Sequence, residues 1–216
     1  MQDAEMSALK TLRSGFFYLS AAMAMLIAVV EFTPAVYTYV SSSVGIMVMV
    51  VFFTLLLPSA IAVFLYAVFW VIRPGMRQLS EVDGRFRVCY TGTTLILVGL
   101  AVLALGTAAV VALATVHAES SLALTVWVLL VGGTIAFTGY VLTFVAGAFK
   151  LYGKYRNPLY VAAVLLLTSG VLSALTELLW LVPVSTAGLS RILTAVGYVL
   201  TYAALDGTIK KLNAQS

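Results

Sequence analysis

Apolar residues fill almost every position of six long stretches of this chain, and polar residues are confined to the short segments between them. Stretches such as "VGIMVMVVFFTLLL" and "LILVGLAVLALG" are apolar on every side, without the alternation that a barrel strand shows over about ten residues. Apolar runs of about 20 residues can cross a bilayer as helices, in which every backbone group is hydrogen-bonded internally. The pattern therefore predicts an all-α polytopic membrane protein.

We expect one domain, residues 1–216, of six transmembrane helices joined as antiparallel hairpins. The expected spans are residues 14–36, 44–72, 88–116, 122–149, 159–182 and 189–209. Because residues 32–72 form one uncharged run that is too long for a single crossing, we expect a turn within residues 41–45. Pro58 predicts a kink in the second span, since proline lacks a backbone donor.

Composition and charge agree with this class and give it an orientation. Of the 216 residues, 62% are hydrophobic and only 9% are charged, against about a quarter in soluble domains. With six spans, one side of the membrane receives eleven of the twelve basic residues: Lys10, Arg13, Arg73, Arg77, Arg85, Arg87, Lys150, Lys154, Arg156, Lys210 and Lys211. Since basic loops stay inside, we expect both termini in the cytoplasm. The basic face is expected to meet anionic headgroups and not nucleic acid.

Candidate catalytic and cofactor chemistry is sparse. The single histidine, His117, and the single cysteine, Cys89, cannot supply a paired-histidine haem, an iron–sulfur cluster or a structural zinc site. No phosphate-binding glycine loop and no nucleophile elbow is present in the sequence. We therefore expect no metal, no cofactor and no enzymatic activity, with His117 and Glu119 in a solvated turn and Cys89 as an apolar filler.

Small residues recur every seven positions in the third and fourth spans and predict a close helix–helix contact. They are Gly92, Gly99 and Gly106 in the third span, and Thr125, Gly132, Gly139 and Ala146 in the fourth. Small side chains let helix backbones approach in lipid, and a seven-residue interval keeps them on one side of the helix. We expect one antiparallel hairpin packed along this seam. The alternative is that one of the two series serves a contact between subunits.

Two opposite charges flank the turn expected between the last two spans. Glu177 and Arg191 lie symmetrically about residue 184. Glu177 is expected near the C-terminus of its helix and Arg191 near the N-terminus of the next, where the helix dipole disfavours a carboxylate and a cation respectively. We hypothesise that they form a structural ion pair across the hairpin. The rival interpretation is an ion or proton site at Glu177, with Arg191 facing headgroup phosphates.

Three segments resemble a known family. The segments "ALKTLRSGFFYLSAAMAML", "FKLYGKYRNPLYVAAVLLLTSGVL" and "TYAALDGTIKKL" are similar to an archaeal family of small multi-span membrane proteins classed as a domain of unknown function. The resemblance implies an archaeal plasma membrane and no established activity, and it assigns no site residues.

Three functional classes remain open from the sequence. The first is an accessory or scaffold subunit that binds other membrane subunits or a second copy of itself. The second is a small transporter or channel for an ion, proton or small solute, which would use Glu177, the kink at Pro58 and the pair Gly132 and Gly133. The third is an enzyme acting on lipid or quinone. We expect the first class, because the spans combine small-residue seams with little polarity.

Overall fold

The computed structural model describes the backbone of residues 2–37, 47, 50, 52–114, 118–156, 159–179 and 184–214. Side chains are described for these residues except 2, 32–37, 52, 114, 118–122, 174–179 and 184–187. The turn expected within residues 41–45 lies outside the described part of the chain.

Long helices make up the described structure, and it contains no strand in these ranges. The chain begins with α1 (Gln2–Tyr37), and the next helical segment consists of η1 (Phe52–Leu56), α3 (Leu57–Tyr66), η2 (Ala67–Ile72) and α4 (Arg73–Val82). A 3-10 turn, η3 (Gly84–Phe86), leads into α5 (Arg87–Ala114). The chain then forms α6 (Ala118–Tyr140), η4 (Val141–Val145), α7 (Ala146–Tyr155), α8 (Leu159–Leu179) and α9 (Val184–Asn213).

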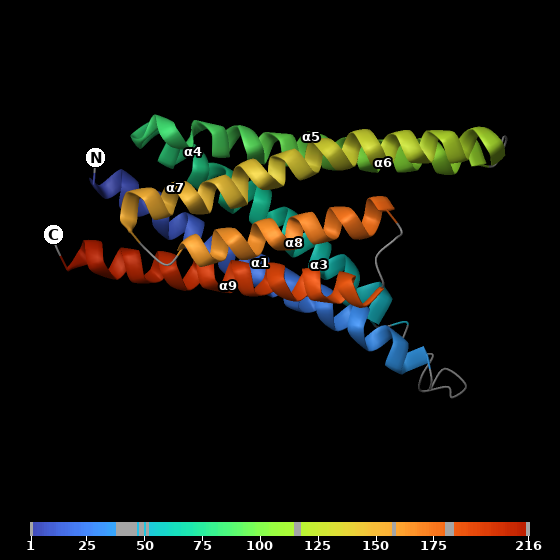
Figure 1. Cartoon of the computed structure of the whole chain (residues 1–216), viewed down its shortest axis with the longest axis horizontal. Coiled ribbons are helices and arrows are strands. Elements are labelled where there is room, and N and C mark those ends of the chain that lie inside the picture. The colour runs from blue at the N-terminus through green and yellow to red at the C-terminus, as the bar shows by residue number, and fades with distance from the viewer. Residues whose placement is uncertain are drawn as a thin grey trace.

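Five of the described helical segments are long and apolar enough to cross a membrane, and residues Leu159–Ser173 of α8 add a shorter apolar stretch. The predicted all-α, polytopic class is therefore confirmed. Both ends of the chain lie at the same end of the molecule (Figure 1), which we call the charged end for the side chains described below.

The helices are close together at the charged end and separate toward the opposite end (Figure 1). The hairpin of α5 and α6 extends along one side, while α1, α3, α8 and α9 run along the other. We call residues 101–113 of α5 and 123–136 of α6 the arm, because this part of the hairpin stands apart from the other helices and its tip lies beyond their ends (Figure 1).

The buried core occupies the half of the bundle nearer the charged end. Met76, Leu151 and Leu205 are among its fully buried side chains. Deeper in the bundle, Phe16 of α1 meets Phe144 of η4 edge-on at a ring-centroid distance of 6.0 Å, and Tyr198 of α9 lies 5.5 Å from Phe144. This aromatic contact joins three helical segments that are distant in the sequence.

The structure differs from the expected spans at residues 73–87, which we expected to form a loop. Here α4 continues the preceding helix to Val82. The reason is an apolar face that persists after the charges begin: Gly75, Met76 and Leu79 are buried, and a Cβ on Gly75 would lie 2.9 Å from the Leu12 side chain of α1. The helix therefore continues beyond the apolar span, through the first charged residues, to Val82.

Three π-helical segments interrupt the long helices within the described residues. One of them, η1, ends at Leu56, directly before the first turn of α3, where Pro58 lies. Because Pro58 has no N–H to donate, a widened turn next to it replaces regular α-helical hydrogen bonding. Another, η4, joins α6 of the arm to α7 at the charged end.

Candidate functional site

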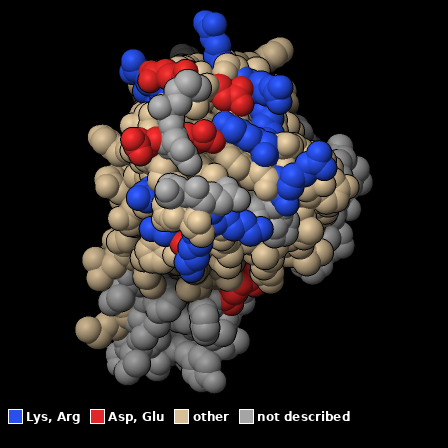
Figure 2. All heavy atoms as spheres, turned by 90° about the vertical axis from the view of Figure 1, so that its left-hand side faces the viewer, with Lys and Arg blue, Asp and Glu red and all other residues tan. Residues whose placement is uncertain are grey.

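A network of ion pairs joins different helices at the charged end, where lysine, arginine and acidic side chains gather (Figure 2). Lys154 of α7 lies between two carboxylates: its Nζ is 2.9 Å from Glu5 Oε1 and 3.8 Å from Asp83 Oδ2. The Tyr155 hydroxyl also donates to Glu5. These contacts connect the start of α1, the turn after α4 and the end of α7.

A second cluster joins α1 to α9. Asp206 lies between two cations, with Arg13 Nη1 2.7 Å from its Oδ1 and Lys210 Nζ 2.7 Å from its Oδ2. The first and last helices of the chain are therefore held together at the charged end.

Arg191 also pairs with α1, toward the opposite end of the bundle. Its Nη1 donates to Glu31 Oε1 at 2.9 Å, and the Glu31 side chain is 50% exposed. The partner hypothesised from the sequence, Glu177, belongs to α8, but its side chain lies outside the described residues. The pair between Glu177 and Arg191 therefore stays a prediction.

The two links between α1 and α9 are separated by somewhat less than the thickness of a bilayer's hydrocarbon core. Arg13 and Glu31 are separated by about 27 Å along α1, at 1.5 Å per residue. Asp206 and Arg191 are separated by about 22 Å along α9 on the same basis. The hydrocarbon core of a bilayer is about 30 Å thick, so both links fit within one crossing of it.

Hydroxyl groups form a node between α6, α8 and α9. The Tyr140 hydroxyl donates to the Leu166 carbonyl at 3.0 Å and lies 3.3 Å from Ser169 Oγ. Ser190 Oγ donates to the Ser169 carbonyl at 2.9 Å. Among the described residues, no buried side-chain nitrogen or oxygen lacks a hydrogen-bond partner. The node thus attaches the base of the arm to the other side of the bundle.

The glycines of the predicted seam lie where α5 and α6 approach most closely. A Cβ on Gly99 would be 2.5 Å from the backbone nitrogen of Ala136, and one on Gly139 would be 2.5 Å from the backbone nitrogen of Ile96. At these positions the two backbones face each other directly. Only a residue without a side chain permits that approach.

The remaining glycines of the predicted seam also lie close to the opposite helical segment, but each meets a different residue. A Cβ would meet Thr143 at Gly92, the Val128 side chain at Gly106 and the Leu103 side chain at Gly132. Thr125 and Ala146, at the two ends of the fourth-span series, are partly buried.

The arm is exposed on all sides apart from the seam. Of the described residues 101–113 and 123–136, only Gly132 is buried. Leu105 is 73% exposed and Trp127 66% exposed. The sequence of the arm contains no charged residue, so its surface suits a lipid or protein environment and not water.

The described part of the chain contains no group of three or more His, Cys, Asp or Glu side chains placed to hold a metal ion. Cys89 is free and buried, against the η4 segment, where its carbonyl accepts a hydrogen bond from Thr143. The side chains of His117 and Glu119 lie outside the described residues.

Sequence reasoning missed both Glu31 as the partner of Arg191 and the Tyr140 node. Glu31 is an isolated carboxylate inside an apolar span, which was a usable signal, but its distance of 160 positions from Arg191 hides the pairing. Tyr140 and Ser169 gave no signal, because single hydroxyl residues are common in membrane helices.

The comparisons with known proteins give one match. A family described as "Protein of unknown function (DUF973)" matches residues 5–216. No curated protein and no solved structure matches the chain. An archaeal source stays a prediction.

Proposed function

Because the chain belongs to the DUF973 family of proteins of unknown function, we propose its role from its geometry: it is an accessory subunit of a larger membrane protein assembly and binds its partner through the arm. The observation that carries this proposal is the exposure of the arm, in which Gly132 alone of the described residues is buried. A hairpin that extends from its own bundle offers other subunits an apolar surface on several sides.

The side of α5 that faces away from the core supports this role. Val98, Leu105 and Ala109 lie roughly opposite the buried residues Cys89 and Thr93, at 100° per residue. All three are exposed and alternate in size. Large and small side chains along one helix face allow another helix to pack closely in lipid, where van der Waals contact drives association.

The orientation and location belong to the same proposal. The charged end lies in the cytoplasm and the arm points outward, because the excess of basic residues marks the cytoplasmic side. The membrane is the plasma membrane, and the basic side chains of the charged end contact anionic headgroups. The protein has no catalytic role of its own. The transport alternative depends on Glu177, whose side chain lies outside the described residues.

Site-specific photocrosslinking in the native membrane tests the arm as a partner surface. A benzophenone amino acid is introduced at Leu105 or Ala109, and at Val161 or Val199 as exposed controls on α8 and α9. We expect both arm positions to crosslink to the same membrane protein of different sequence, and the controls to give none of that product. Adducts with lipid alone, or with a second copy of this chain alone, would overturn the accessory-subunit proposal.

A further inference from the structure

Two arginines mark the same border of the apolar part of the molecule. Arg73 is the first charged residue after the uncharged residues 32–72, and Arg87 is the last one before the uncharged residues 88–116. Arg73 begins α4 and Arg87 begins α5, and these two helices pack against each other. Both arginines therefore lie at the level where the apolar segments end and the charged end begins.

The two arginines meet the same aromatic residue, Tyr90 of α5. The guanidinium carbon of Arg73 lies 5.8 Å from the centre of the Tyr90 ring, an arrangement in which the ring attracts the cation. Arg87 lies three positions before Tyr90, on the same side of α5. The Arg73 residue is partly buried and Arg87 is exposed. We call these two residues the arginine pair, since together they present two cations on one patch of surface.

No carboxylate of the described part of the chain neutralises the arginine pair. The ion pairs of the charged end use other cations, namely Arg13, Arg77, Lys154 and Lys210. None of these ion pairs includes Arg73 or Arg87. The patch therefore keeps two positive charges, which an anion from outside these residues can balance.

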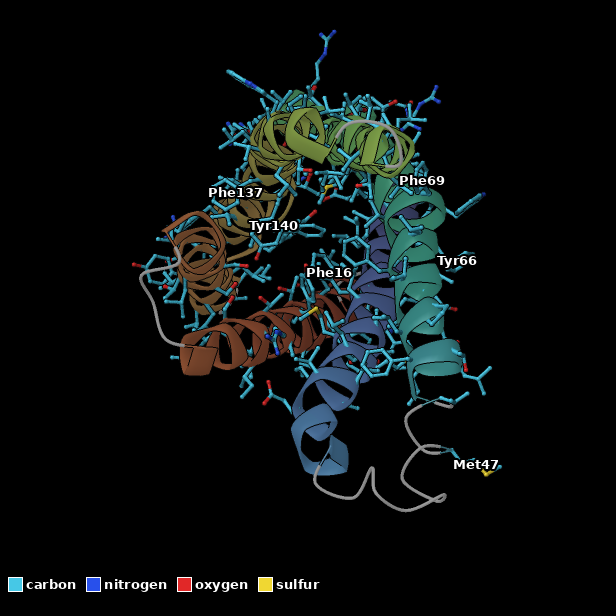
Figure 3. The ribbon with its side chains drawn as sticks, turned by 90° about the vertical axis from the view of Figure 1, so that its right-hand side faces the viewer. Phe16, Met47, Tyr66, Phe69, Phe137 and Tyr140 are labelled. Atoms are coloured by element: carbon cyan, nitrogen blue, oxygen red, sulfur yellow. The ribbon has the colours of Figure 1, made fainter. Side chains whose placement is uncertain are left out.

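Exposed aromatic rings precede Arg73 on the apolar side of the border. Trp70 is 67% exposed and Tyr66 47% exposed, and their rings are stacked with centroids 6.1 Å apart. Phe69 is exposed as well and lies about one turn before Arg73. Tyr66 and Phe69 belong to the helical segment on one outer side of the bundle (Figure 3). Because tyrosine and tryptophan gather where hydrocarbon meets headgroups, these rings place the arginine pair at headgroup level.

We propose that the arginine pair binds the phosphate group of an anionic phospholipid. A guanidinium group donates two parallel hydrogen bonds to phosphate oxygens, and two such groups on one patch can bind the same phosphate. The exposed rings of Phe69 and Trp70 suit the apolar part of the same molecule, which favours a lipid phosphate over a dissolved one. This site rests on the headgroup contact proposed above and gives it specific residues, but it requires neither the arm nor its protein partner.

Substitutions that each remove one positive charge test the site. Arg73→Gln and Arg87→Gln act on the arginine pair. Arg77→Gln is the matched control, because it removes the same charge about one turn further along α4, where Glu81 pairs with it. Native mass spectrometry of the full chain in detergent measures the dissociation constant of phosphatidylglycerol, with zwitterionic phosphatidylcholine as the reference lipid.

We expect wild type and Arg77→Gln to bind phosphatidylglycerol equally well and more tightly than phosphatidylcholine. Arg73→Gln and Arg87→Gln should each bind it about tenfold more weakly or worse, because losing a hydrogen bond between charged groups costs that much. The exposed Arg87 decides the matter if Arg73→Gln does not fold.

Three results would overturn the site. Equal affinity of all variants for phosphatidylglycerol, with the preference of wild type intact, would remove the arginine pair and leave the general headgroup contact standing. An equal loss in Arg77→Gln would show that only the total charge matters, and displacement of the lipid by inorganic phosphate would assign the pair to a dissolved anion. If wild type shows no preference between the two lipids, the headgroup contact of the proposed function fails together with the site.

Discussion

A methyl group added at Gly139 should separate α5 from α6 at the base of the arm. The new Cβ would lie 2.5 Å from the backbone nitrogen of Ile96 and 2.6 Å from the carbonyl oxygen of Gly92. Both are backbone atoms, so no side-chain rotation can relieve the contact. Nor can α6 easily move, because the neighbouring Tyr140 is hydrogen-bonded to Leu166.

The size of the effect follows from two opposing contributions. Overpacking in a well-packed site costs about 1–3 kcal/mol, while replacement of a helical glycine by alanine gains up to about 1 kcal/mol. Gly133 is the matched control, since its Cβ would meet nothing within 4 Å and Gly133→Ala carries only the gain. The free energies of unfolding of Gly139→Ala and Gly133→Ala should therefore differ by about 1–3 kcal/mol.

Thermal unfolding followed by circular dichroism in one detergent measures this difference. For a chain of this size, about 2–4 °C of Tm corresponds to 1 kcal/mol, so Gly139→Ala should unfold about 2–12 °C below Gly133→Ala. Gly106→Ala should fall between them, because the atoms that its Cβ meets belong to the Val128 side chain and not to the backbone. Equal Tm values for Gly139→Ala and Gly133→Ala would refute the backbone contact as a source of stability.

Three further predictions concern the ion pair, the node and the orientation. Glu31→Gln and Arg191→Met should each lower the free energy of unfolding by about 0.2–1 kcal/mol, because the Glu31 side chain is half exposed, and the double mutant should recover much of the loss; simple additivity in this thermal-unfolding cycle would argue against the pair. Tyr140→Phe should cost about 1 kcal/mol through one lost hydrogen bond, and an unchanged Tm would show that the node contributes nothing. In sealed vesicles, Ser42→Cys should react with an impermeant thiol reagent from outside and Gln78→Cys should not, whereas labelling of Gln78→Cys would reverse the proposed orientation.

The sequence alone was enough to predict the class and the α5–α6 contact, because both depend on short-range periodicity. Apolar runs specify helices in a membrane, and the seven-residue interval of Gly92, Gly99 and Gly106 sets one face of a helix whatever surrounds it. The extent of α4 was missed because charge was taken as a sign of a loop, although Met76 and Leu79 continue the apolar face of the helix.

Contacts between distant helices could not be predicted in the same way. The sequence places Glu177 next to Arg191 in a hairpin, whereas the observed partner Glu31 comes from the opposite end of the chain. Predicting Glu31 as a partner of Arg191 requires knowing that α1 as well as α8 lies beside α9, and that depends on how the whole bundle closes. The exposure of the arm likewise depends on how the other helices pack, which the sequence of the arm itself does not specify.

The two ion pairs between α1 and α9 have a consequence for biosynthesis. On α1 the cation, Arg13, precedes the carboxylate, Glu31, and on α9 the cation, Arg191, precedes the carboxylate, Asp206. Because the two helices are antiparallel, Arg13 meets Asp206 and Glu31 meets Arg191. The ribosome releases α1 first and α9 last. During translation, α1 therefore emerges long before its partners on α9, and the two ion pairs can form only after residues 191 and 206 have been synthesised. A chain that stops before residue 191 lacks the cation that pairs with Glu31, so truncation of α9 alone removes both links that hold the first helix to the last.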